Sequence, residues 1–153
     1  MLPTTTKRVT GHTTDRINEE IRSRTAHDIF CLSNADKNAI DERLKELDCE
    51  WNIERALEAN AGAFALLGIG LGTFVSKKWF ILPGVVAGFL LQHALQGWCP
   101  PVPVFRRLGF RTPREIEIER ISLKILRGDL KDVSNMVSEG QKDAGRIMES
   151  AEA

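Results

Sequence analysis

The sequence has no excess of either charge. Lysine and arginine together number 21, aspartate and glutamate also number 21, and the formal net charge is zero. No block of basic residues stands out along the chain. A protein that binds nucleic acid needs a basic face, because every phosphate of the backbone carries negative charge. We therefore expect no nucleic-acid partner.

Cysteine is scarce, and the three cysteines lie far apart at positions 31, 49 and 99. They have neither the spacing of zinc ligands nor the even number of a disulfide framework. The simplest interpretation is reduced thiols facing a cytoplasm. We expect no metal and no cofactor.

Recognisable catalytic motifs are lacking as well. The glycine-rich segment 68–72 lies inside an apolar run, without the strand and the later acidic residue of a nucleotide-binding loop. No order of serine, histidine and aspartate suggests a hydrolase. We expect a protein that is not an enzyme.

The N-terminus lacks apolar periodicity. Residues 1–15 are mostly polar, so we expect no cleavable signal peptide, and any membrane segment would be internal. Residues 1–13 are rich in threonine and are predicted to be disordered.

What the chain does contain is two long runs without a charged residue. They cover residues 59–76 and 79–105, on either side of Lys77 and Lys78. A helix of about 20 residues is about 30 Å long, which matches the hydrocarbon core of a bilayer. A buried helix of a soluble protein rarely stays uncharged for so long.

We therefore predict an all-α protein with a transmembrane helical hairpin over residues 52–105. Its two helices are expected at about 53–75 and 79–97. The alternative is a pair of core helices in a soluble protein.

Glycines predict how the two helices pack. Gly68 and Gly72 form one GxxxG motif, and Gly84 and Gly88 form another. If the chain folds back at residues 77–78, Gly72 falls level with Gly84 and Gly68 with Gly88. Small residues at matched depth let two membrane helices approach closely. The other interpretation is that one GxxxG face forms a homodimer.

Aromatic and basic residues predict the orientation. Trp79 follows the turn, whereas Trp51 and Trp98 lie near the other boundary, as expected of interfacial anchors. Only two lysines lie at the turn, and more cations lie at the other end, namely Arg55, Arg106, Arg107, Arg111 and Arg114. The positive-inside rule then places both termini in the cytoplasm.

The flanks are predicted to be cytoplasmic and helical. Residues 14–51 read as amphipathic helices, with apolar residues at helical spacing. In the segment 106–128, Thr112 begins a helix that ends near Gly128, because a threonine cap followed by proline and glutamate is a typical start. Residues 129–153 form a polar tail, mostly disordered or weakly helical.

Cys99 is the candidate thiol site. It follows the helix-ending Gly97 and precedes Arg106 and Arg107, cations that would lower the pKa of a thiol. The other interpretation is a packing residue in a helix-ending turn.

His93 is the candidate intramembrane polar residue, because an ionisable group inside a spanning helix is often functional. Glu58, Asn60 and Gln96 are expected at similar depth and complete a polar cluster. This cluster either fixes the register of the hairpin or handles a proton or ligand. One histidine and one cysteine do not make a metal site.

Three segments together resemble the YgaP-like transmembrane domain family, a bacterial inner-membrane hairpin of unassigned function. They are residues 52–55 (NIER), 97–100 (GWCP) and 108–112 (LGFRT), and the resemblance covers roughly residues 52–112. It implies a two-helix membrane module that dimerises, with Cys99 at the position of the family's cysteine. Some members carry a fused rhodanese domain, for which this chain has no room.

These observations favour a small two-pass protein of the bacterial inner membrane that serves as an anchoring or interaction module. Its expected partners are the lipid bilayer, a second copy of the chain, or an unidentified membrane or cytoplasmic protein. The alternative function is a thiol- or sulfur-handling membrane protein that uses Cys99.

Overall fold

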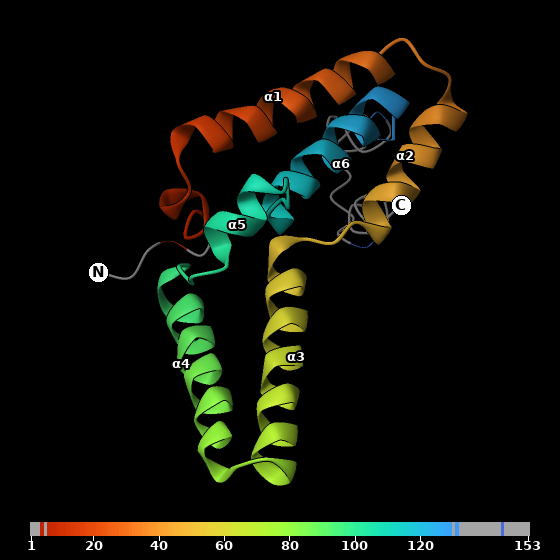
Figure 1. The fold of residues 1–153 in the computed structure, drawn as a ribbon. Coiled ribbons are helices and arrows are strands. Elements are labelled where there is room, and N and C mark those ends of the chain that lie inside the picture. The colour runs from red at the N-terminus through yellow and green to blue at the C-terminus, as the bar shows by residue number, and fades with distance from the viewer. Residues whose placement is uncertain (1–3, 5, 130, 132–144, 146–153) are drawn as a thin grey trace. The chain divides into compact units, whose positions relative to one another are not determined.

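The computed structural model describes residues 4, 6–129, 131 and 145, and this part of the chain is all helical (Figure 1). The all-α prediction is thus confirmed for the described residues. The predicted polar tail lies almost entirely outside them. The elements are the 3-10 helices η1 (Thr10–His12) and η2 (Lys77–Phe80), and the α-helices α1 (Asp15–Leu32), α2 (Lys37–Cys49), α3 (Ile53–Phe74), α4 (Ile81–Gln96), α5 (Val102–Arg107) and α6 (Pro113–Arg127).

The chain divides into two compact units. The first, here called the hairpin unit, consists of Met1–Ser23 and Trp51–Glu115. The second, here called the flanking unit, consists of Arg24–Glu50 and Ile116–Ala153. Each unit has its own cluster of buried apolar side chains.

Two long antiparallel helices dominate the hairpin unit (Figure 1). Asn52 caps the start of α3, because its side-chain oxygen accepts a hydrogen bond of 2.8 Å from the backbone N–H of Arg55. Gly97 ends α4 with a left-handed backbone (φ 77°), which a glycine adopts without strain. We call the end of the hairpin near Asn52 and Gly97 its base and the end at residues 75–80 its tip.

The hairpin helices are long, apolar and largely uncovered. Two helices, ending at Phe74 and Gln96, are long and apolar enough to cross a membrane, judged by length and composition. Only 17% and 6% of their most apolar stretches are buried. A core helix of a soluble protein would be mostly buried, so these two are not core helices of the described part of the chain.

Close packing in the hairpin involves the glycines of α3 but not those of α4. A Cβ placed on Gly68 would lie 2.5 Å from the side chain of Pro83, and one on Gly72 would lie 2.9 Å from the ring of Phe80. A Cβ on Gly84 or Gly88 would meet nothing within 4 Å. The predicted packing of glycine against glycine is therefore wrong.

The reason is the shape of the tip. Residues 77–80 form η2 instead of a tight turn, so α4 begins only at Ile81. The contacts of Gly72 and Gly68 therefore fall on Phe80 and Pro83, about one helical turn before the predicted glycines. Self-association through the face that carries Gly84 and Gly88 stays a prediction of the sequence.

Alanine substitutions test this register. We expect Gly68→Ala to destabilise the hairpin by about 1–3 kcal/mol, because the added methyl group overpacks the contact with Pro83. Gly84→Ala should cause no loss, because the site is open and alanine favours a helix. Unfolding in mild detergent, followed by circular dichroism, compares the two. Equal losses would show that the glycines of α4 pack after all.

The base of the hairpin is held by an apolar cluster. Val9, Ile53, Leu57, Cys99 and Val102 are buried together, and Phe105 and Phe110 pack against them, with ring centroids 5.3 Å apart. Burial of each aliphatic side chain contributes about 1.5–3 kcal/mol. This cluster ties α3, α5 and the N-terminal segment to one another.

Residues 6–13 are a correction to the sequence interpretation, which has them disordered. They form a strap across the hairpin base, here called the N-terminal strap, which contains η1. Val9 is only 3% exposed, and Arg8 bonds to both α3 and α4. The composition of the segment gave no sign of this, because the partners of Arg8 lie more than 40 residues away in the chain.

In the flanking unit, the buried cluster comes from α2 and α6. Ile40, Leu44 and Leu47 of α2 meet Ile116 and Leu123 of α6. The helix start predicted at Thr112, which belongs to the hairpin unit, is confirmed, because Thr112 and Glu115 exchange the two hydrogen bonds of a capping box. Gly128 (φ 99°) follows the end of α6, as predicted.

Candidate functional site

Polar side chains gather at the base of the hairpin. His93 of α4 is 5% exposed, and its Nε2 atom lies 2.8 Å from a carboxylate oxygen of Glu54 on α3. The other carboxylate oxygen accepts a hydrogen bond of 3.0 Å from Arg8. Arg8 also donates to the backbone carbonyl of Ala94, at 3.0 Å. The strap thereby links both hairpin helices.

This triad replaces the predicted polar cluster. Glu58 and Gln96 are exposed, and neither Asn60 nor these two residues bonds to His93 in the described part of the chain. The partner of His93 is Glu54, one helical turn before Glu58. The side chain of Glu58 is exposed, whereas that of Glu54 is only 26% exposed and reaches His93.

A second network surrounds Arg106, whose side chain is fully buried. Its two terminal nitrogens donate to the carboxylate of Glu115, at 2.6 and 2.8 Å. They also donate to the side-chain oxygen of Asn18 at 3.0 Å and to the carbonyl of Phe110 at 3.1 Å. A bidentate pair with further acceptors is the geometry that makes a buried charge tolerable.

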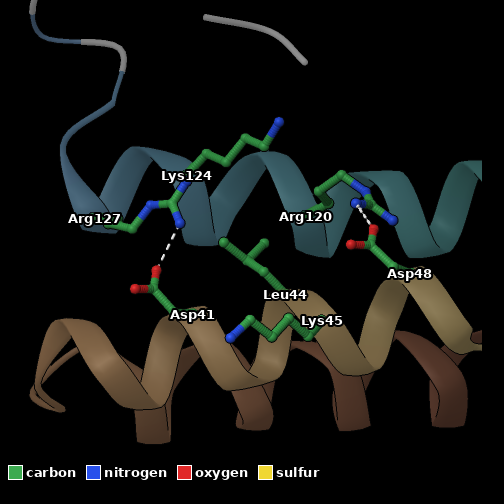
Figure 2. Close-up of a pocket in the computed structure, with 7 residues that line it drawn as sticks. All are labelled: Asp41, Leu44, Lys45, Asp48, Arg120, Lys124 and Arg127. Atoms are coloured by element: carbon green, nitrogen blue, oxygen red, sulfur yellow. Dashed lines mark hydrogen bonds and ion pairs between the residues drawn. The ribbon is translucent and has the colours of Figure 1, made fainter. Parts of the chain in front are cut away.

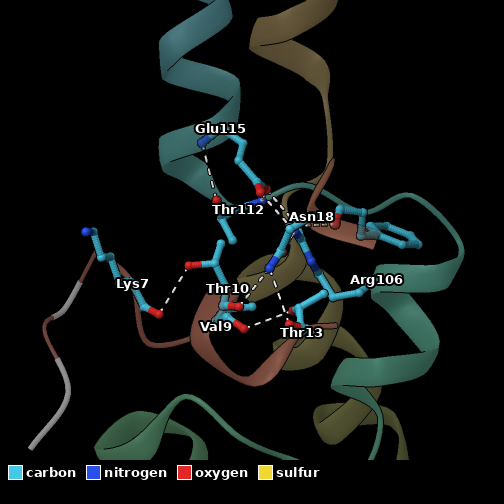
Figure 3. Close-up of polar contacts among 9 residues, drawn as sticks. Lys7, Val9, Thr10, Thr13, Asn18, Arg106, Thr112 and Glu115 are labelled. Atoms are coloured by element: carbon cyan, nitrogen blue, oxygen red, sulfur yellow. Dashed lines mark hydrogen bonds and ion pairs between the residues drawn. The ribbon is translucent and has the colours of Figure 1, made fainter. Parts of the chain in front are cut away.

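Asn18 joins this network to the N-terminal strap (Figure 3). Its amide nitrogen donates to the carbonyl of Thr10 at 2.9 Å, while its oxygen accepts from Arg106. On the other side, Glu115 accepts from the backbone N–H of Thr112 at 2.7 Å. One connected set of bonds therefore fixes the strap, α5 and the start of α6.

The network also sets the charge of Glu115. Burial raises the pKa of this carboxyl, but the hydrogen bonds from Arg106 and Thr112 outweigh burial and hold the pKa below its ordinary value. The group is thus a carboxylate at neutral pH. Arg106 and Glu115 therefore neutralise each other's charge, which suits a structural role.

Cys99 does not have the environment of a reactive thiol. It is 5% exposed, within the apolar cluster at the base, and burial raises its pKa. The expectation that neighbouring arginines lower this pKa is wrong. Arg106 is neutralised by Glu115, and the side chain of Arg107 is exposed. The packing interpretation therefore fits better than the thiol site.

Thiol labelling distinguishes the three cysteines. We expect a maleimide reagent to label the exposed Cys31 and Cys49 within minutes, and Cys99 at least tenfold more slowly, because it is buried and its thiolate is disfavoured. Mass spectrometry of tryptic peptides measures the three rates. Labelling of Cys99 as fast as Cys49 would restore the thiol site as a candidate.

The flanking unit contains an open groove of about 340 Å³ between α2 and α6 (Figure 2). Ion pairs cross it, from Arg127 to Asp41 at 2.6 Å and from Arg120 to Asp48. Leu44, Lys45 and Lys124 complete its lining. Both aspartates of the lining are thus paired with arginines. Among the described residues, no group of three or more histidine, cysteine or acidic side chains could hold a metal ion.

Comparisons with protein-family models, curated proteins and solved structures find no match to this chain.

The site residues that sequence reasoning missed are Arg8, Asn18, Glu54 and Glu115. Of these, only Glu115 had a local signal, as the third residue of a capping box. The predicted interfacial tryptophans do lie at opposite ends of the hairpin, with Trp79 in η2 at the tip and Trp51 beside α3 at the base. Both are nearly half exposed, and Trp98 follows α4 at the base.

Proposed function

We propose that this chain is a two-pass protein of the bacterial inner membrane, whose hairpin anchors a helical flanking unit. The observation that carries this proposal is the uncovered apolar surface of α3 and α4. The large side chains that remain exposed there include Phe64, Leu66, Leu67, Phe74, Ile81, Val85 and Leu91. Surface of this extent needs an apolar environment.

The dimensions of the hairpin support a bilayer as that environment. α3 has 22 residues, and at about 1.5 Å per residue it is about 33 Å long. A hydrocarbon core is about 30 Å thick. The polar ends fit as well, because Lys77 and Lys78 lie exposed at the tip and the networks of Arg8 and Arg106 lie at the base.

The cytoplasmic orientation of both termini is part of the proposal. The chain enters and leaves the hairpin at its base, so both flanks lie on one side of a membrane. Arg55, Arg107 and Arg114 are exposed near the base. The positive-inside rule favours the cytoplasm for the end with more arginine and lysine.

Membership of the YgaP-like family belongs to the same proposal and rests on segments 52–55, 97–100 and 108–112. Asn52 and Gly97 of these segments cap the two hairpin helices. The polar side chains around Arg8 and Arg106 at the base bind one another, which supports an anchoring or interaction module in preference to an enzyme. Burial of Cys99 counts against sulfur chemistry.

Alkaline carbonate extraction of membranes tests the anchor. We expect the full chain to stay in the pellet, because both helices are embedded. Arginine at Leu67 and Leu91, which are 52% and 62% exposed, should release it or prevent insertion. Phe30→Arg is the matched control, since Phe30 is exposed but lies outside the hairpin. Release of the wild-type chain into the supernatant would overturn the proposal.

Thiol accessibility in intact cells tests the orientation. A membrane-impermeant maleimide should label an introduced Ser76→Cys at the tip from outside. It should reach the native Cys31 only after the membrane is permeabilised. The reverse pattern would place both termini outside.

A further inference from the structure

Two exposed arginines at the hairpin base differ from Arg8 and Arg106 in having no carboxylate partner among the described residues. Arg8 and Arg106 are held by Glu54 and Glu115. Arg55 and Arg107 are exposed, and over the ranges that the structure describes neither forms an ion pair. Two cations at the base are therefore available to an external anion.

Arg55 is held in place by an aromatic ring. Its guanidinium lies over the ring of Trp51, 4.5 Å from the centroid. This cation–π contact leaves the N–H edge of the guanidinium open to a phosphate. Trp51 is 47% exposed at the start of α3, the position in which a tryptophan serves as an interfacial anchor.

Arg107 lies on an apolar outer face of α5. The inner side of this short helix is buried, with Val102 fully covered and Arg106 in its network. On the outer side, Val104 is 55% exposed and Leu108, just after the helix, is 68% exposed. Residues three and four apart share one face of a helix, so Arg107 and Leu108 fall on the same face as Val104.

An exposed apolar pair beside an arginine is the pattern of a segment that lies in a membrane interface. α5 starts shortly after α4 ends and packs against α3, so both features belong to the hairpin base. If the hairpin spans a bilayer, this base lies at the level of the headgroups.

We infer that Trp51, Arg55, Val104, Arg107 and Leu108 form a collar that binds the headgroups of anionic phospholipids. The inference rests on the proposed membrane function and deepens it. The apolar side chains enter the boundary between headgroups and acyl chains, while the two arginines contact lipid phosphates. A zwitterionic headgroup offers no net negative charge, so the collar prefers anionic lipid.

Native mass spectrometry of the full chain in mild detergent tests this preference. We expect phosphatidylglycerol to stay bound at several times the level of phosphatidylcholine with the same acyl chains. Arg55→Gln with Arg107→Gln should remove this preference, because it deletes the two charges that contact the lipid phosphates. Equal retention of both lipids by the wild type would overturn the inference. Retention of glycerol phosphate at the level of phosphatidylglycerol would also overturn it, because that result would show a site for a free anion.

Two further variants separate charge from folding. Arg16→Gln with Arg22→Gln is the matched control, because both arginines are exposed on α1 and the change in net charge is the same. This control variant should keep the preference for phosphatidylglycerol. Loss of the preference in the control would show that any positive charge on the chain attracts the lipid. Arg55→Lys with Arg107→Lys keeps the charge and should keep most of the preference. Loss in both the lysine and the glutamine variants would assign the arginines a structural role instead.

Carbonate extraction of the membranes from which these samples are prepared separates failure of the lipid collar from failure of the membrane anchor. A wild-type chain that stays in the membrane but shows no lipid preference overturns the collar alone. A wild-type chain that washes off overturns the collar and the membrane anchor together.

Discussion

Replacing Glu115 with glutamine is expected to cost about 3–5 kcal/mol of the free energy of unfolding, because it leaves a buried arginine without its counter-charge. The side chain of Arg106 is 0% exposed and relies on the two oxygens of Glu115, at 2.6 and 2.8 Å. Glutamine keeps the shape of the side chain but supplies one acceptor and no charge. Denaturant unfolding in mild detergent measures the loss.

Glu117→Gln is the matched control. Glu117 pairs with Arg120 at 3.2 Å, but its side chain is 54% exposed, and surface pairs contribute about 0–1 kcal/mol. A double variant, Glu115→Leu with Arg106→Met, removes both charges and should recover much of the stability that Glu115→Gln loses. If Glu115→Gln lowers the free energy of unfolding by less than about 1 kcal/mol, the pair of Arg106 and Glu115 does not stabilise the hairpin base.

The same pair predicts how stability depends on pH. The pKa of Glu115 is lower in the folded chain than its ordinary value of 4.5, because its bonds with Arg106 and Thr112 outweigh burial. A depressed pKa means that this stabilisation is complete above the unfolded pKa and is lost as the pH falls through the folded pKa. We expect wild-type stability to fall below about pH 4.5 and the difference from Glu115→Gln to shrink there.

How far the sequence could predict this structure depends on the range of each signal. The caps at Asn52 and Thr112 and the glycine stops at Gly97 and Gly128 were readable, because each acts within a few residues. The two apolar helices were readable for the same reason, since the absence of charge is a local property. These signals fix where helices begin and end.

Contacts between helices were not readable, because they depend on register. The tip forms a 3-10 helix instead of a tight turn, and the facing residues shift by about one helical turn. This shift exchanges Gly84 for Phe80 as the neighbour of Gly72. The partner of His93 was missed for another reason, because the side chain of Glu58 is exposed and that of Glu54 reaches His93. The strap was missed because Arg8 and Val9 acquire their partners only when the distant base assembles.

Replacing Gly97 with alanine is the second change with a large expected effect, because it acts on the backbone and on the strap together. Gly97 has a φ of 77°, which costs a residue with a side chain about 1–2 kcal/mol. An added Cβ would also lie 2.5 Å from the backbone carbon of Arg8 and 2.6 Å from its oxygen. Backbone atoms cannot rotate away as a side chain can, so the N-terminal strap must move away from the hairpin base.

Release of the strap uncovers Val9, whose burial contributes about 1.5–3 kcal/mol, and breaks the bonds from Arg8 to Glu54 and Ala94. We therefore expect a total loss of about 3 kcal/mol or more. Trypsin reports the local event, since it cleaves after Lys7 and Arg8. Cleavage there should be slow in the wild type and at least tenfold faster in Gly97→Ala.

Gly109→Ala separates strain from collision. Gly109 also has a positive φ, of 91°, but an added Cβ there would meet nothing within 4 Å. This variant should lose only the backbone contribution of about 1–2 kcal/mol and keep the strap protected from trypsin. If Gly97→Ala and Gly109→Ala behave alike in both measurements, the close approach of Arg8 to Gly97 does not hold the strap. If only Gly97→Ala exposes the strap, residues 6–13 clamp the base from which both hairpin helices extend.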